Sequence, residues 1–264
     1  MTDILQRITQ ATKLRIAKQK SQVPLIDLIQ ACQTMPITNQ NSFEQALRTK
    51  GLSYICECKK ASPSKGVIAE NFDYLQIAKE YESIGAQAIS VLTEPEFFLG
   101  KDSYLQTIAQ NVHLPCLRKD FVIDEYMIYQ AKVLGAKAIL LIVSLLDETT
   151  LKKYLQLATS LGLDCLVEVH DEAEIEQALT CGAKIIGINN RNLRNFTVDL
   201  THTLNLRRQI PKEVLLVAES GIKNRQDIEL LEQAKIDAVL IGETLMKDKN
   251  RALKLAQLRG EVLE

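Results

Sequence analysis

The sequence has no excess of basic residues, and this absence argues against two classes of partner. The 264 residues include 32 Lys and Arg against 33 Asp and Glu, giving a formal net charge of -1 and a pI near 6.4. Proteins that bind nucleic acid or anionic membranes usually have a clustered basic surplus. We therefore expect neither partner, and we interpret the basic stretch from Lys13 to Lys20 as a solvated helix face.

The six cysteines and three histidines lack the spacing of metal ligands or redox pairs. His113, His170 and His202 form no i, i+4 pair, so we predict no metal site. The cysteines form no C-x-x-C pair, and most lie in apolar runs where Cys behaves as a small hydrophobe. We expect reduced core thiols of a cytosolic protein at Cys32, Cys56, Cys58, Cys116, Cys165 and Cys181.

The N-terminus lacks an apolar core of the kind that a signal peptide needs, and it lacks a membrane-length run. We therefore expect a cytoplasmic protein. Residues before about 50 show helical patterns without strands: apolar residues from Ile4 to Ile16 follow helical spacing loosely, and Pro24 suits a first helical turn. We predict one domain over residues 1–264, in which about 1–50 form a helical extension, because α/β barrels of about 250 residues are often single domains.

From residue 52 onward, short runs rich in Val, Ile and Leu alternate with stretches of helical periodicity. Such near-continuous apolar runs are typical of parallel strands that are covered on both faces. We predict eight strands, at residues 53–58, 88–92, 114–117, 138–143, 164–169, 184–188, 214–218 and 238–241.

An internal echo supports a closed arrangement of these strands. I-G-A-Q-A-I-S at Ile84, L-G-A-K-A-I-L at Leu134 and C-G-A-K-I-I-G at Cys181 recur roughly every 50 residues, the length of two βα units. An open doubly wound sheet would more often begin with a G-x-G-x-x-G turn, and the sequence has none. The predicted fold class is α/β, a (β/α)8 TIM barrel with an N-terminal helical extension.

Polar residues gather where the predicted strands end. In the first strand, Glu57 and Lys59 share one face while Cys56 and Cys58 share the other, because side chains alternate along a strand. A carboxylate and an ammonium projecting together are costly unless they pair with each other or with a ligand. One such residue at one strand end can simply mark where a buried strand reaches solvent. Several together favour an active site at the barrel mouth: Glu57, Lys59, Lys119, Glu168, Asn189, Arg191 and Glu219.

The ends of the last two strands suggest a phosphate site. Barrel enzymes often hold phosphate with the loops after strands 7 and 8. Ser220-Gly221 and Gly242-Glu243 offer closely approached backbone N–H groups there, although two glycine turns that only end strands are the alternative. Glu243 has the wrong charge for a phosphate ligand, so its backbone rather than its side chain is assigned to this site.

Two further features leave alternatives open. His170 follows the predicted strand 164–169 and is either a proton carrier or, as such positions more often are, a loop residue beside the site. Phe97 and Phe98 follow L-T-E-P-E after the second strand and are either core aromatics or a stacking surface for a ring.

Taken together, the motifs of the chain resemble those of the indole-3-glycerol-phosphate synthase family. The resemblance covers the barrel from its first to its last strand, in family order, and the helical N-terminus also matches. The matching motifs are E-C-K-K-A-S-P-S-K-G at Glu57, S-V-L-T-E-P-E-F-F-L-G at Ser90, L-R-K-D-F at Leu117, L-V-E-V-H at Leu166, I-G-I-N-N-R-N-L at Ile186, A-E-S-G-I at Ala218 and L-I-G-E-T-L-M at Leu240.

The resemblance implies a reaction of tryptophan biosynthesis that needs no organic cofactor and no metal. The implied substrate is 1-(2-carboxyphenylamino)-1-deoxyribulose 5-phosphate, which closes a ring and loses CO₂ and water to give indole-3-glycerol phosphate. It also implies a phosphorylated small molecule as partner. We expect a monomer, because no unusual apolar helix face stands out in the sequence.

Residue roles are implied by the same resemblance. Lys119 looks like the acid that protonates the substrate ketone. Lys59 would pair with the anthranilate carboxylate and is an alternative acid for the dehydration. Glu168 looks like the base that also stabilises the cationic intermediate. The remaining implied roles are Glu57 holding Lys59 and a substrate hydroxyl, Asn189 and Glu219 completing the polar ring, Arg191 binding the carboxylate, Phe98 contacting the ring, and Ser62, Ser220 and Gly221 binding the phosphate, with the 62–66 loop as a mobile flap.

Two rival hypotheses remain at this stage. A barrel that binds phosphate ligands without catalysis would be expected to have lost one of Glu57, Lys59, Lys119 or Glu168, and all four are present. Another phosphate-sugar barrel, such as an isomerase, would release no CO₂.

Overall fold

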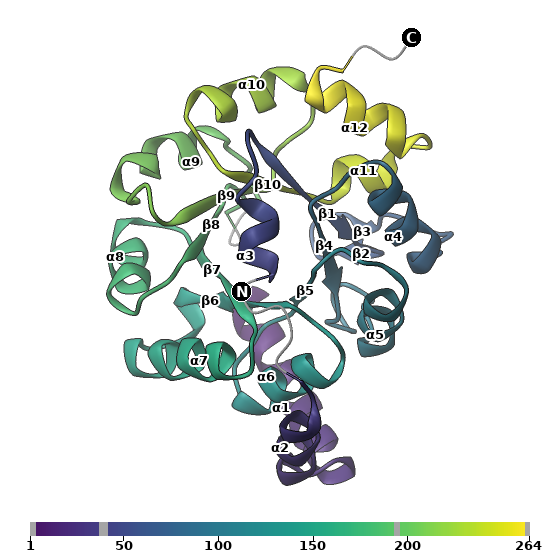
Figure 1. Cartoon of the computed structure of the whole chain (residues 1–264), viewed down its shortest axis with the longest axis vertical. Helices are drawn as coiled ribbons and strands as arrows, with labels where there is room; N and C mark the ends of the chain where they lie inside the picture. Colours follow the sequence, from purple (N-terminus) through teal and green to yellow (C-terminus); the bar gives the residue numbers. More distant parts are fainter. Residues whose placement is uncertain (1–3, 37–41, 193–195, 262–264) are drawn as a thin grey trace.

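Eight parallel strands close into a barrel in the computed structural model, which describes residues 4–36, 42–192 and 196–261. Around the barrel, the strands follow the order β1-β10-β9-β8-β7-β6-β5-β4 (Figure 1). The predicted fold class is confirmed. The strands are β1 (Ser53–Cys58), β4 (Ala88–Leu92), β5 (Cys116–Lys119), β6 (Ala138–Ile142), β7 (Asp164–Val169), β8 (Ile185–Asn189), β9 (Leu215–Glu219) and β10 (Ala238–Ile241).

Helices form an outer ring around the strands (Figure 1). Several begin after an Asp or Asn whose side chain accepts a backbone N–H from the first turn, which satisfies a donor that has no partner inside the helix. These caps are Asp73, Asp124, Asp147, Asp171, Asn224 and Asn250. The helical segments of the ring are α4 (Tyr74–Ser83), α5 (Asp102–Asn111), α6 (Glu125–Val133), η1 (Val143–Leu145), α7 (Glu148–Ser160), α8 (Glu172–Thr180), α9 (Thr201–Leu206), η2 (Arg207–Gln209), α10 (Arg225–Gln233), α11 (Glu243–Lys247) and α12 (Arg251–Arg259).

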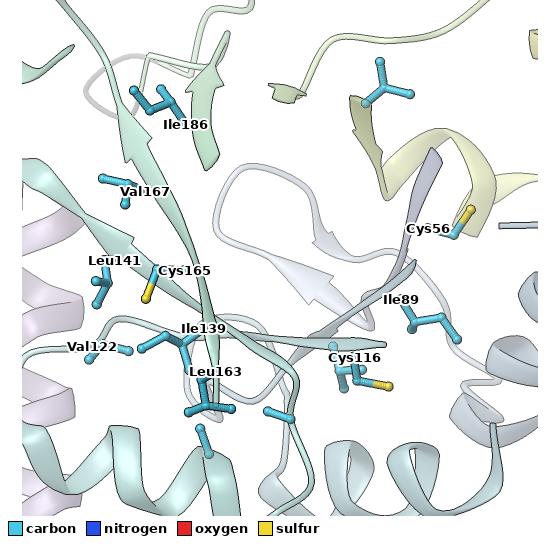
Figure 2. Close-up of a cluster of buried hydrophobic side chains, with 14 of the residues drawn as sticks. Cys56, Ile89, Cys116, Val122, Ile139, Leu141, Leu163, Cys165, Val167 and Ile186 are labelled. Carbon is cyan, nitrogen blue, oxygen red and sulfur yellow. The ribbon is translucent and has the colours of Figure 1, made fainter. Parts of the chain in front are cut away.

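Because side chains alternate between the two faces of each strand, the hydrophobic core has two parts, one inside the barrel and one between the strands and the helices. Ile55 of β1 points inward and packs with Leu117, Leu166 and Val217 inside the barrel. Cys56, on the opposite face, belongs to the larger core between strands and helices, where Figure 2 shows it with residues such as Cys116, Ile139 and Val167. All six cysteines are free and buried, as predicted.

The N-terminal helices contact both ends of the barrel. α1 (Ile4–Gln22) places Ile8 in the interior cluster, and α2 (Leu25–Thr34) packs on α6. α3 (Ser42–Leu47) inserts Phe43 and Leu47 at the other end and lies in the centre of the view in Figure 1. Asp164, the first residue of β7, accepts the N–H groups of Phe43 and Glu44, each at 3.0 Å. In the expected helical extension, α1 therefore lies at the mouth of the barrel and α3 at its base.

The described helices include none that combines the length and the apolar character needed to cross a membrane.

Four strand predictions differ from the structure by one or two residues. β6 ends at Ile142, one residue earlier than predicted, because Val143 begins the 3-10 turn η1. β5 begins at Cys116 rather than at 114, because Pro115 has no N–H to donate to a ladder. β8 and β9 end at Asn189 and Glu219, one residue later than predicted, because these two residues still pair with each other in the ladder.

A short antiparallel hairpin of β2 (Ala61–Ser62) and β3 (Gly66–Val67) was not predicted as such and occupies the expected loop. Its strands have two residues each, so neither shows the alternation from which strands are read.

Candidate active site

A cavity of about 450 Å³ lies at the C-terminal ends of the strands. Each predicted site residue lines it, although the residues come from seven of the strands and the loops that follow them. The thirteen residues are Glu57, Lys59, Ser62, Phe98, Lys119, Glu168, Asn189, Arg191, Glu219, Ser220, Gly221, Gly242 and Glu243. No metal-binding group of three or more His, Cys, Asp or Glu is found among residues 4–36, 42–192 and 196–261.

Glu57 and Lys59 form the ion pair that the sequence suggested. Lys59 Nζ lies 2.5 Å from Glu57 Oε1, and Ser90 Oγ donates to Glu57 Oε2 at 3.4 Å. Burial by itself raises the pKa of Glu57, but the ammonium groups of Lys59 and Lys119 outweigh burial and hold the pKa below its usual range. Glu57 is therefore a carboxylate at neutral pH.

Glycine at position 242 makes room for this pair. A Cβ at Gly242 would lie 2.3 Å from Glu57 Oε1 and 2.8 Å from Lys59 Nζ, distances that no side chain tolerates. Gly242 thus has a packing role in addition to the backbone role that the sequence suggested.

Lys119 lies between two carboxylates. Its Nζ donates to Glu219 Oε2 at 2.8 Å and lies 3.6 Å from Glu168 Oε2. Burial alone lowers the pKa of Lys119, but the charges of Glu219, Glu168 and Glu57 outweigh burial and raise it above its usual range. Lys119 is therefore an ammonium ion, the form that can donate a proton.

The residues on either side of Lys119 hold its strand end in place. Arg118 is fully buried and donates to Thr93 Oγ1, to Met127 O and to Asp102 Oδ1. Asp120 accepts a hydrogen bond from Arg15 of α1 at 2.8 Å. Since each buried charge has a partner of opposite sign, this network orders the chain around Lys119 without leaving an unpaired ion.

Glu168 and Glu219 complete the polar ring. Asn189 Nδ2 donates to Glu168 Oε1 at 3.2 Å. Burial, together with the neighbouring charge of Glu168, raises the pKa of Glu219 to about 7 despite the opposing effect of Lys119. Glu219 Oε1 is buried and has no hydrogen-bond partner in the described structure. This oxygen lies 2.3 Å from where a Cβ of Gly187 would be, so Gly187 leaves the space that Glu219 occupies.

Cations surround the end of the cavity near β8 and β10. Glu243 accepts a hydrogen bond from Lys247 at 2.6 Å and lies 3.5 Å from Arg191 and 3.9 Å from Lys65. Ser220 has a positive φ of 67°, as does Gly221 with 90°, so their turn is left-handed. The side chain of Glu243 therefore pairs with cations.

Three lysines that line this end were missed by the sequence analysis: Lys65, Lys223 and Lys247. Lys65 lies in the β2–β3 hairpin, Lys223 follows the turn at Gly221, and Lys247 lies on α11. At such positions beyond the strand ends, the sequence does not distinguish a site lysine from an ordinary solvated one. The apolar wall from α1, made by Ile4, Leu5 and Ile8, was not predicted either. Their helical spacing indicates a buried face but does not say which surface the face covers.

Phe98 and Phe97 have different environments. Phe98 lines the cavity, with its ring centroid 6.0 Å from that of Phe121. Phe97 does not line it and lies under the guanidinium of Arg7, 5.4 Å from ring centroid to Cζ. Of the two phenylalanines, Phe98 is the one placed to contact a ligand.

His170 lies outside the cavity, in a neighbouring hollow of about 980 Å³. Its Nε2 is 3.9 Å from Glu168 Oε1 and its Nδ1 is 3.5 Å from Glu174 Oε2. Burial alone lowers the pKa of His170, but the two carboxylates outweigh it and raise the pKa. The structure favours the interpretation of His170 as a loop residue beside the site.

The arrangement of these side chains is suited to acid–base chemistry on an anionic, partly aromatic ligand. Comparison with known proteins identifies the family. The family model described as indole-3-glycerol phosphate synthase matches residues 5–258. The chain belongs to the indole-3-glycerol phosphate synthase family. The resemblance read from the motifs is thereby confirmed.

Curated members of the family match over nearly their whole length. The indole-3-glycerol phosphate synthase of Ruminiclostridium cellulolyticum is 49% identical over 257 residues, which cover 97% of this chain and 99% of the relative. That of Lacticaseibacillus casei is 50% identical over 256 residues, covering 97% and 98%.

Solved structures of other barrels share the fold at low identity. Thiamine phosphate pyrophosphorylase from Pyrococcus furiosus has a TM-score of 0.61 at 16% identity and covers 81% of this chain and 96% of its own. KGPDC from Streptococcus mutans has a TM-score of 0.61 at 12% identity, covering 80% and 97%. These likenesses concern the fold alone.

Proposed function

We propose that this protein converts 1-(2-carboxyphenylamino)-1-deoxyribulose 5-phosphate into indole-3-glycerol phosphate, CO₂ and water, as a step of tryptophan biosynthesis. The observation that supports this most is the position of Lys119 between Glu168 and Glu219, in a cavity with an aromatic side chain on one side and cations at one end. Membership of the family supports the same reaction.

Lys119 would protonate the ketone oxygen while the aromatic ring attacks the carbonyl carbon. The proton comes from an ammonium that the surrounding carboxylates keep charged. The new carbon–carbon bond leaves a positive charge on the ring and its nitrogen. Glu168, and Glu219 in its ionised form, would stabilise this charge, because fixed carboxylates act strongly in a buried site.

Loss of CO₂ then returns an electron pair to the ring. In the last step the hydroxyl leaves as water while a base removes the proton from the neighbouring carbon, which completes the aromatic indole. Glu168 is our candidate for the base and Lys59 an alternative acid for the leaving hydroxyl. Glu57 would hold Lys59 and a substrate hydroxyl, and Asn189 would orient Glu168 through the bond at 3.2 Å.

Different parts of the cavity would bind the carboxylate, the aromatic ring and the phosphate of the substrate. We assign the anthranilate carboxylate to Lys59 and Arg191, and the ring to Phe98. The phosphate is assigned to Ser62 and to the backbone groups of Ser220, Gly221, Gly242 and Glu243, with the lysines at that end adding positive charge. We further propose that residues 1–264 act as one domain, as a monomer, in the cytoplasm and without a nucleic-acid partner.

The test uses purified protein, the substrate and a metal chelator. Because the chain has no tryptophan, indole fluorescence that appears after mixing comes from the product rather than from the protein. We expect product and CO₂ in equal amounts. Turnover without CO₂ would indicate an isomerase. Tight binding with no product at high protein concentration would instead support a barrel that binds phosphate ligands without catalysis.

A further inference from the structure

A buried carboxylate holds the loop on which Phe98 lies. Glu94 is 2% exposed and follows β4. Its Oε1 accepts the N–H of Glu96 at 3.0 Å, and its Oε2 accepts the N–H groups of Phe97 at 2.7 Å and of Phe98 at 3.0 Å. Three consecutive backbone groups therefore depend on one side chain.

The main chain closes the same loop. Gly100 N donates to Glu94 O at 2.8 Å, so the loop returns to the residue where it began. A Cβ at Gly100 would lie 2.4 Å from Leu92 O, which shows how closely the loop packs on the end of β4. Leu99 adopts a positive φ of 53° between them. The Glu94 side chain and main chain together therefore hold both ends of this loop.

Glu94 has no other evident task. It does not line the cavity, and among the described residues it forms no ion pair within 4.0 Å. Burial raises the pKa of Glu94, and the three backbone N–H groups only partly offset that effect. Burying a carboxyl group costs solvation free energy. The three hydrogen bonds that Glu94 accepts from the backbone of residues 96–98 explain why it is nevertheless buried.

We propose that Glu94 is a positioning residue, which acts through the 96–98 turn to orient Phe98 and thereby sets the affinity for the aromatic ring of the substrate. This inference rests on the proposed function, since it takes an aryl-amino sugar phosphate as the ligand.

The test measures ligand affinity rather than turnover. The probe is the substrate with its ketone reduced to an alcohol, which binds but cannot close a ring. The second probe is ribulose 5-phosphate, which has the sugar phosphate but no aromatic ring. For Glu94→Gln, which keeps the shape but replaces one acceptor oxygen by an NH₂ group, we expect the Kd for the reduced analogue to rise about ten-fold. The Kd for ribulose 5-phosphate should stay within about two-fold.

A second variant shows whether the effect passes through Phe98. In a Phe98→Ala background, Glu94→Gln should change the Kd for the reduced analogue by less than about two-fold, because the ring it positions is gone. Equal effects in both backgrounds would overturn the proposal, and so would an unchanged Kd in the single variant.

Asp164→Asn is the matched control. Asp164 is also a buried carboxylate whose oxygen accepts two backbone N–H groups, and burial raises its pKa too, but it lies at the opposite end of the barrel. We expect it to lower the melting temperature without changing either Kd. A rise in Kd equal to that of Glu94→Gln would refute a specific role for Glu94. If the unaltered protein binds the analogue but makes no product from the substrate, the proposed function fails, whereas the Kd comparison still decides the role of Glu94.

Discussion

Gly187→Ala adds one methyl group and should disable the site without unfolding the barrel. The new Cβ would lie 2.3 Å from Glu219 Oε1, whereas contact begins at roughly 3.4 Å. The carboxylate must therefore move by about 1 Å, since its neighbours in the strand backbone cannot. Glu219 Oε2 is 2.8 Å from Lys119 Nζ, so a shift of that size takes the pair beyond the range of a good hydrogen bond.

A misplacement of about 1 Å in a catalytic group typically costs about 100-fold in rate. We expect kcat/KM, followed by the indole fluorescence of the product, to fall about 100-fold. Because Gly187 has no left-handed φ, an alanine adds no backbone strain there, and the loss of stability comes from the displaced buried carboxylate, about 1–3 kcal/mol. The barrel should therefore stay folded.

The control separates Glu219 from the other neighbour of the new methyl group. Leu166 Cδ1 would lie 3.1 Å away, so Leu166→Ala in the Gly187→Ala background relieves that contact alone. We expect no recovery of activity. Recovery, or a Gly187→Ala variant within about three-fold of the parent kcat/KM, would refute the reasoning.

Three other predictions follow from the same geometry. Lys119→Ala should lower kcat by about 10³-fold while the Kd for inorganic phosphate, measured by calorimetry, stays within about two-fold; near-normal kcat would exclude Lys119 as the acid. Glu219→Gln should remove a pH dependence of stability. Burial raises the pKa of Glu219 from 4.5 to about 7, so between these pH values the folded chain binds a proton that the unfolded chain does not. The contribution of Glu219 to the free energy of unfolding is therefore fullest below pH 4.5 and declines as pH rises to about 7. Urea unfolding across that range should show the free energy of unfolding of the parent falling relative to the variant, and parallel curves would contradict this. Amide hydrogen exchange should be faster in the turn from Ser62 to Gly66 than in β1 and should slow when product binds; protection there equal to that of β1 would argue against a mobile flap.

The strands and much of the site could be predicted because both depend on local rules. Val- and Ile-rich runs mark strands buried on both faces, and alternation assigns Glu57 and Ile55 to the same side. Since all strands of a parallel barrel end at one mouth, polar residues from distant parts of the sequence could be expected to meet there.

Other features depend on distances that sequence patterns do not contain. Nothing in the strand 185–189 says that Gly187 leaves space for Glu219, since the clash appears only when two neighbouring strands are placed side by side. Likewise, the helical pattern of α1 indicates an apolar face, but the docking of Ile8 over the mouth follows from tertiary contacts such as Arg15 with Asp120. Cations such as Lys247 are exposed residues whose role depends on the ligand beside them.

The most direct measurement of the central claim is an experimental structure with indole-3-glycerol phosphate bound. The account predicts the indole ring against Phe98, the phosphate at the turns of Ser220-Gly221 and Gly242-Glu243, and Lys119 within hydrogen-bond distance of the glycerol chain. A phosphate bound away from these turns, or a product with Lys119 out of reach, would contradict it.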